Sequence, residues 1–370
     1  MNAPALRLPH AALVRLALDD GSAVHGRGFG AARAVRGEVV FNTAMAGYVE
    51  ALTDPSYCGQ ILVFTYPLVG NYGVPPPRRP GSLEPPYESE RIQVQGVVVQ
   101  NYVDAHSHHA ACRSLHEWLA AEGVPGLTGV DTRTLTRRLR ERGTMQGSLV
   151  PSSTSDVPQG VDMREEVFRI VAPRGPLRYG EGKPAILLVD AGAKDNIVRS
   201  LLARGASVVR APWHADLAGA ARDADAIVIG NGPGDPKDLA PLIGQVRSLL
   251  ASYRKPILGV CLGNQILALA AGADTYKLPY GHRGVNQPVQ DLLTRRCYVT
   301  SQNHGYAVSD ASLPAAWEPW FVNINDGTNE GIRSREHPYF GVQFHPEASP
   351  GPLDTGFLFD DFLKQCSASI

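Results

Sequence analysis

The chain has 370 residues, a length that favours two domains over a single core. Its hydrophobic fraction of 44% and charged fraction of 19% are typical of a globular protein and exclude a disordered or membrane-spanning class. A formal net charge of -1 provides no broad electrostatic surface for nucleic acid or for a membrane. We therefore expect neither as a partner.

The five cysteines are scattered and have no C-x-x-C spacing, so we expect no zinc site or redox pair and favour a reduced, cytoplasmic setting. We interpret four of them as buried, inert thiols: Cys58, Cys112, Cys297 and Cys366. Near the N-terminus the apolar residues are interrupted by Arg7, Arg15 and Asp19, so no secretory signal is expected. No segment approaches the roughly 20 apolar residues of a membrane-spanning helix.

Residues 1–150 are predicted to form a compact α+β domain. Short β-type runs are found at 37–41, 60–66 and 94–100. One helix is predicted from Ala111 and another from Asp131, with Asp131 as the N-cap and Gly143 as the stop. The proline-rich segment 74–86 is predicted to be a loop, because proline lacks the N–H that strand pairing needs.

Residues 151–183 are polar and rich in Gly, Pro and Ser around one short helix, which is typical of a linker. A second domain, 184–370, opens with the apolar run 185–192, as in a strand covered on both faces. Helical and strand patterns then alternate, which indicates βαβ units. The predicted fold class is α/β, with a mainly parallel sheet in this domain and the smaller α+β domain before it.

The most informative segment is KPILGVCLGNQILALAAG, where a short apolar strand at 257–260 runs directly into Cys261 and a helix follows. Gly259 and Gly263 flank the cysteine as in a G-x-S-x-G nucleophile elbow with sulfur in place of oxygen. The helix N-terminus favours a thiolate, so Cys261 is a candidate nucleophile. The N–H of Leu262 is then placed to bind an oxyanion.

A nucleophilic thiolate needs a partner that carries a proton, and histidine suits that task. His345 follows an apolar strand in YFGVQFHPEASPGP, and Glu347 lies two residues later, where its carboxylate can orient the imidazole. His304 is placed in a polar loop, where substrate contact is favoured over base chemistry. The cluster His106, His108 and His109 lacks ligands at metal-binding spacing and is predicted to be surface-exposed. No functional motif surrounds His10, His25, His116, His214, His282 and His337.

The elbow GVCLGNQ together with the distant FHPE resembles the class I, triad-type glutamine amidotransferases. Three further strings narrow the resemblance to the small subunit of carbamoyl-phosphate synthase: GNGPGDP (230–236), QNHGYAV (302–308) and HPEASPGP (345–352). Strings of the first domain are similar to that subunit's own N-terminal domain: GEVVFNTAMAGYVEALTDPSY (37–57), TYPLVGNYG (65–73) and VDTRTLTRRLRERG (130–143). The resemblance covers nearly the whole chain.

The resemblance implies a triad of Cys261, His345 and Glu347 that hydrolyses L-glutamine through a cysteinyl thioester. The oxyanion donors would be the N–H of Leu262 and a backbone N–H of the segment 232–234. The implied glutamine contacts are Ser56, Gly232, Gly234, Leu262, Gln265, Asn303, Gly305 and Tyr306. No metal is implied. Asn264, Ala191 and Tyr306 depart from the family's usual residues, and at Asn264 we expect altered packing with the chemistry kept.

The resemblance further implies a large-subunit partner, in a small–large heterodimer, that uses ATP and bicarbonate to make carbamoyl phosphate from the released ammonia. The chain itself contains no P-loop, and no cofactor of its own is expected. The first domain would dock onto that partner. Its helix from Asp131 carries several arginines, but Glu141 is interleaved, so a solvated or subunit-facing helix is favoured over nucleic-acid binding.

Three alternatives stay open at this point. The chain is another class I amidotransferase that supplies a different synthase, a non-catalytic regulatory or scaffolding subunit, or a free-standing cysteine hydrolase. The N-terminal strings disfavour the first alternative, and the intact triad disfavours the second. Low glutaminase activity that rises when a synthetase is added would exclude the third. Whether the product serves arginine or pyrimidine synthesis also stays open.

Overall fold

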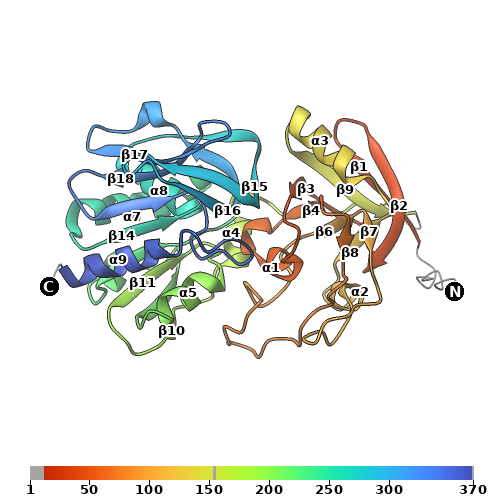
Figure 1. Cartoon of the computed structure of the whole chain (residues 1–370), viewed down its shortest axis with the longest axis horizontal. Coiled ribbons are helices and arrows are strands. Elements are labelled where there is room, and N and C mark those ends of the chain that lie inside the picture. Colours follow the sequence, from red (N-terminus) through yellow and green to blue (C-terminus); the bar gives the residue numbers. More distant parts are fainter. Residues whose placement is uncertain (1–11, 153–155, 369–370) are drawn as a thin grey trace. The chain divides into compact units, whose positions relative to one another are not determined.

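The computed structural model describes residues 12–152 and 156–368. Residues 1–11, within the stretch where no secretory signal is expected, and 153–155, within the predicted linker, lie outside the described ranges. The chain divides into two compact units, Met1–Val161 and Asp162–Ile370 (Figure 1).

The first unit is built around a closed barrel of seven strands. In barrel order these are β1 (Leu13–Leu18), β2 (Ala23–Gly30), β8 (Pro125–Thr128), β6 (Gly96–Val99), β4 (Gln60–Phe64), β3 (Val35–Asn42) and β9 (Met145–Pro151). The pairing of β1 with β9, with Leu16 opposite Leu149, closes it. A separate two-stranded sheet pairs β5 (Leu68–Val69) with β7 (Asn101–Tyr102). Each expected β-type run overlaps a barrel strand, but barrel closure was not predicted.

The helices of this unit are α1 (Tyr48–Thr53), the 3-10 helix η1 (Pro55–Tyr57), α2 (Leu115–Ala121) and α3 (Thr132–Arg142). Asp131 is the N-cap of α3, where its side chain accepts a hydrogen bond from the N–H of Thr134, and Gly143 is the C-cap. Both predictions for this helix are confirmed. The preceding helix begins later than expected, because Ser114 and Glu117 form a capping box at the start of α2.

The second unit contains one ten-stranded sheet. Its strands, in spatial order, are β10 (Leu177–Tyr179), β12 (Ser207–Pro212), β11 (Ala185–Asp190), β13 (Ala226–Ile229), β14 (Ile257–Val260), β19 (Tyr339–Val342), β18 (Asn329–Ser334), β17 (Trp317–Asn323), β15 (Thr275–Asp291) and β16 (Cys297–Val308). The strands β12, β11, β13, β14 and β19 run parallel, and the others pair antiparallel. A parallel core is therefore extended by an antiparallel half.

The second unit's helices include the predicted crossovers between the parallel strands. They are α4 (Glu166–Val171), α5 (Asp195–Leu202), α6 (Leu217–Ala220), η2 (Pro236–Leu239), α7 (Ala240–Ser252), α8 (Leu262–Ala271), η3 (Asp310–Ser312) and α9 (Phe357–Ala368). The predicted linker contains α4 and also β10, which pairs with β12. A three-residue edge strand has too little periodicity to be detected in a sequence. In the described ranges, every helix is too short or too polar to cross a lipid bilayer.

Candidate active site

Cys261 lies at a sharp turn between β14 and α8, with a φ of 55° and a ψ of -104°. Non-glycine residues rarely adopt a positive φ, and such strain is concentrated at functional sites. A Cβ on Gly263 would lie 1.9 Å from the carbonyl oxygen of Ile229, and one on Gly259 would lie 2.6 Å from the backbone of Gly263. Both glycines are therefore required by close backbone approach, and the predicted elbow is present.

The pairing of two parallel strands brings the nucleophile and the histidine to the same edge of the sheet. Val260 at the end of β14 lies opposite Val342 at the end of β19, and the Cys261 N–H donates to the Val342 carbonyl at 2.8 Å. His345 follows three residues later, where its N–H donates to the Ser301 carbonyl at 2.9 Å. The carboxyl edge of an open parallel sheet is where such folds bind ligands.

His345 and Glu347 form a buried pair, with 2.6 Å between His345 Nδ1 and Glu347 Oε1. Burial lowers the pKa of His345, but the charges of Glu347 and Cys261 outweigh burial and raise it to about 10. Burial raises the pKa of Glu347, but His345 and Lys194 outweigh it and lower it to about 2. The geometry keeps Glu347 ionised, so it can hold the imidazole by its Nδ1–H and leave Nε2 for chemistry.

Lys194 is a further charged residue of the site that the sequence analysis missed. Its Nζ lies 3.3 Å from Glu347 Oε1, the same oxygen that faces His345, and it also donates to the Ala348 carbonyl. Its side chain is only 3% exposed. A buried lysine requires a charge partner. The signal available in the sequence was a lysine four residues after the end of a buried strand, in the string DAGAK.

The loop that carries Lys194 is held by buried charges. Asp190 accepts the N–H groups of Gly192 and Ala193, each at 2.7 Å. Arg210 pairs with Asp190 and with Asp195, at 2.6 Å from the latter, and donates to the Ala193 carbonyl at 2.7 Å. Since an ion cluster of this kind fixes the backbone between its members, it fixes the direction in which Lys194 points.

The Cys261 sulfur has neighbours on strand β16 and at Gln343, the residue directly after β19. Cys261 Sγ lies 3.7 Å from the Asn303 carbonyl oxygen and 3.7 Å from Nε2 of Gln343, a residue that the sequence analysis missed. The Gln265 amide donates to the Tyr306 carbonyl at 2.8 Å and to Gln343 Oε1 at 3.1 Å. The amide N–H groups of Gln265 thus position neighbours of the nucleophile, and its contact with glutamine stays a prediction.

The glycine loop after β13 approaches the elbow closely. A Cβ on Gly232 would lie 2.4 Å from the Ala191 carbonyl oxygen and 2.7 Å from the side chain of Leu262. Gly234 has a φ of 78°, which favours glycine. The first N–H groups of a helix have no acceptor within it, so the Leu262 N–H is suited to an oxyanion. The loop therefore lies beside the residue that carries the other predicted donor.

Two of the expectations drawn from the sequence are wrong in detail. His304 lies in strand β16, opposite His282 of β15, and not in a loop. Neighbouring strands bury the polar string that was interpreted as a loop. Cys112 and Cys297 are exposed, whereas Cys58 and Cys366 are buried as expected. Cys297 begins an edge strand, where a small thiol can face solvent.

The remaining predicted contacts are distributed over both units. Gly305 follows His304 in β16 and is half-buried. Ser56 is buried in η1 of the first unit, where its N–H donates to the Asp54 carboxylate at 2.9 Å. The contact of Ser56 with glutamine stays a prediction. In the cluster 106–109, His108 and His109 are exposed and His106 is half-buried.

Comparison with known proteins assigns the family of this chain. A family model described as carbamoyl-phosphate synthase small chain, CPSase domain, matches residues 16–149, and one described as glutamine amidotransferase class-I matches residues 187–365. The carbamoyl phosphate synthase small chain of Methanopyrus kandleri is 46% identical over 95% of this chain and 98% of its own length. The chain belongs to the carbamoyl-phosphate synthase small chain family. The resemblance in the sequence strings is thus confirmed over both units.

A relative from Neosartorya fischeri, named carbamoyl phosphate synthase arginine-specific small chain, is 45% identical over 95% of this chain and 80% of its own length. Among solved structures, a glutamine amidotransferase from Thermotoga maritima is 18% identical, with a TM-score of 0.35 over 45% of this chain and 77% of that one. The class I amidotransferase match falls on the unit that contains the Cys261 elbow and the His345–Glu347 pair.

Proposed function

We propose that this chain hydrolyses L-glutamine to glutamate and ammonia as the small subunit of a glutamine-dependent carbamoyl-phosphate synthase. The observation that carries the proposal is Cys261 in a strained elbow at the sheet edge where the buried His345–Glu347 pair also lies. Family membership supports the same assignment.

In the proposed mechanism, the Cys261 thiolate attacks the side-chain amide carbon of glutamine, and the carbonyl becomes an oxyanion at the N–H of Leu262 and the glycine loop. His345 donates its proton to the amide nitrogen, the C–N bond breaks, and ammonia leaves behind a thioester. His345 then removes a proton from water, which attacks the thioester and releases glutamate. Each step needs the imidazole orientation that Glu347 supports.

The partner is proposed to be the large subunit, which would bind ATP and bicarbonate and receive the ammonia. Docking is assigned to the first unit, where helix α3 exposes most of its arginines and buries Leu135 and Leu139. We propose a cytoplasmic setting, since all five cysteines are free thiols. Arginine synthesis is favoured for the product, because the Neosartorya relative is named arginine-specific.

The test is the Cys261→Ala variant in complex with the large subunit. Glutamine-dependent carbamoyl phosphate formation should be lost, while synthesis from added ammonium salt should continue, because ammonia bypasses the thioester. Full glutamine-dependent activity would refute the nucleophile assignment. Loss of the ammonia-dependent reaction in a folded, assembled complex would refute the proposed division of labour.

A further inference from the structure

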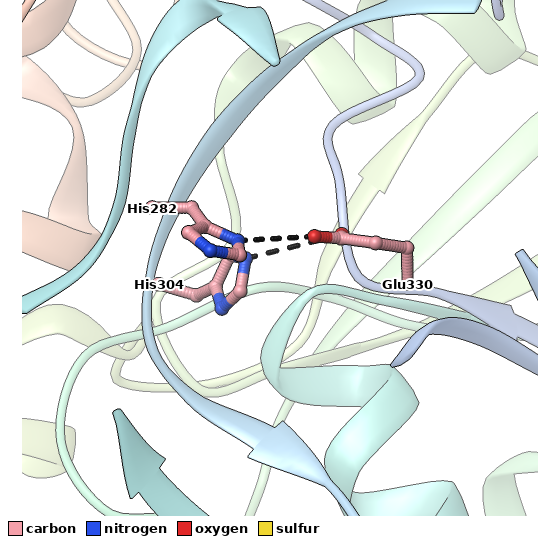
Figure 2. Close-up of side chains that lie close together, drawn as sticks. All are labelled: His282, His304 and Glu330. Carbon is pink, nitrogen blue, oxygen red and sulfur yellow. Dashed lines mark hydrogen bonds and ion pairs between the residues drawn. The ribbon is translucent and has the colours of Figure 1, made fainter. Parts of the chain in front are cut away.

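Three buried residues of the second unit converge beside strand β16, and none of them carries a proton or forms a bond in the proposed mechanism. His282 lies on β15, His304 on β16 and Glu330 on β18. Figure 2 shows the Glu330 carboxylate facing both imidazole rings. His282 Nδ1 lies 3.0 Å from Glu330 Oε1, and His304 Nε2 lies 3.9 Å from Glu330 Oε2. Their side chains are 7%, 2% and 0% exposed in that order.

The outer nitrogens of both rings face oxygens that only accept hydrogen bonds. His282 Nε2 lies 2.8 Å from the Asp326 carboxylate, and His304 Nδ1 lies 2.8 Å from the Tyr306 carbonyl. A neutral imidazole carries one N–H. If that N–H serves the outer acceptor, the inner nitrogen of each ring presents a lone pair toward Glu330. Histidine ligands of metal ions are held in this way, with the far N–H on a carboxylate or carbonyl.

Glu330 provides an independent sign of a missing partner. Its Oε2 is buried and accepts no hydrogen bond from any residue in the described part of the chain, whereas Oε1 accepts one from the Asn323 amide at 3.0 Å. A buried carboxylate oxygen without a donor is costly, so a positive group is required nearby. With both rings in that tautomer, two nitrogen lone pairs and one carboxylate oxygen without a donor are directed at one point, which is a metal-ligand arrangement.

We propose that His282, His304 and Glu330 bind one divalent transition-metal ion, with Zn²⁺ as the best fit, in a structural site separate from the catalytic thiol. The donor atoms all lie within 4.8 Å of one another. Ligands on a tetrahedral zinc at 2.0–2.2 Å are about 3.4 Å apart, so small shifts would complete the site. Two imidazole nitrogens disfavour Mg²⁺ and Ca²⁺, which prefer oxygen.

A fourth ligand is available from the strand that already carries His304. Gln302 is buried, and its Oε1 lies 3.2 Å from His304 Nε2. The ion would join β15, β16 and β18 next to Asn303, whose carbonyl oxygen faces the Cys261 sulfur. Its effect would therefore be to hold that strand in place. The sequence analysis expected no metal because these ligands come from three separate strands.

The test measures metal binding to the full-length chain with Cys261→Ala, so that the catalytic thiol cannot bind the ion. Co²⁺ titration should give one tight equivalent with the visible absorption of a tetrahedral site, and Zn²⁺ should displace it. In the same background, Glu330→Gln should weaken binding at least 100-fold. Asp326→Asn, which weakens the support of His282 and removes no ligand, should weaken it about 10- to 100-fold. The matched control His337→Gln, a histidine outside the cluster, should bind as the parent does.

X-ray absorption at the zinc edge supplies a readout that does not depend on any cluster variant folding. Two imidazoles with oxygen and no sulfur are expected. A sulfur ligand would place the ion on a thiol such as exposed Cys112 or Cys297 and would refute the site. Affinity unchanged by Glu330→Gln, or no binding of either metal at micromolar concentration, would also refute it. In the latter case a doubly protonated His282 would bridge Asp326 and Glu330 in place of an ion.

Discussion

Lys194 Nζ and Glu347 Oε1 are 3.3 Å apart, and that carboxylate oxygen is also the one that faces His345 Nδ1. A positive charge on each side of one carboxylate stabilises its ionised form. We expect Lys194→Met to reduce the glutaminase kcat about 10- to 100-fold, since a hydrogen bond to a charged group contributes about 1.5–3 kcal/mol. The measurement is steady-state glutamate release.

The matched control for that change is Lys364→Met. Lys364 is an exposed lysine on α9 that pairs with Asp361 at 2.9 Å. It should leave the rate unchanged, because solvent screens exposed ion pairs. Equal rates in the Lys194 variant and the parent would show that Glu347 orients His345 without the positive charge of Lys194.

Glu347→Gln is expected to lower the glutaminase rate less than His345→Asn does. The histidine variant loses the proton carrier, and general acid–base catalysis contributes about 10²–10⁴-fold. The glutamine variant retains the imidazole and loses only the charge that orients it. Single-turnover thioester formation and hydrolysis should be measured for both. Equal and total loss would mean that Glu347 does more than orient.

The coupled pair gives the fold a pH dependence on both sides of neutrality. Since the pKa of Glu347 is lowered from 4.5 to about 2, its contribution to stability is present above 4.5 and is lost as the pH falls toward 2. Since the pKa of His345 is raised from 6.5 to about 10, its contribution is full below 6.5 and is lost as the pH rises through 10.

Thermal melts of the whole chain between pH 6 and about 10 test the alkaline side. The parent Tm should fall across this range, and the Tm difference between the parent and His345→Asn should shrink. In Cys261→Ala the decrease in Tm should occur at lower pH, because the charge on Cys261 helps to raise the pKa of His345. A constant Tm difference would indicate that His345 has an ordinary pKa.

Two helical glycines make a matched pair for the elbow. In Gly263→Ala the added Cβ would meet the Ile229 carbonyl oxygen at 1.9 Å, so we expect a destabilisation of at least about 1–3 kcal/mol and lost activity. Gly244 in α7 is exposed, and a Cβ there meets no atom within 4 Å. Gly244→Ala should stabilise the fold by about 0.4–1 kcal/mol and keep activity. Urea unfolding measures both, and equal effects would contradict the elbow geometry.

The sequence predicted those parts of the site that lie in short continuous strings. The strand, Cys261 and the following helix are adjacent in the chain, so glycine spacing and apolar periodicity were enough. His345 and Glu347 are two residues apart, and proline between them marked a turn. The helix cap at Asp131 was readable for the same reason, because capping joins residues three apart.

Features that depend on distant residues were not predictable from local patterns. Lys194 meets Glu347 only after the sheet has formed, and His282 on β15 meets Glu330 on β18 only after β17 has paired with both strands. Barrel closure by β1 and β9 joins the two ends of the first unit. The polar segment around His304 was wrongly predicted to be a loop, because polarity alone does not distinguish a solvated turn from a strand that its neighbours bury.

Strand β19 is synthesised after the other nine strands of its sheet, yet it lies between β14 and β18 in the middle of that sheet. Cys261 would therefore emerge from the ribosome long before β19, the strand that precedes His345 and completes the sheet. Until then, the partly made unit has an open sheet centre and no proton carrier beside the thiol. Glutaminase activity should thus begin only after residues 339–347 have been synthesised, so a chain stalled before them would not consume glutamine.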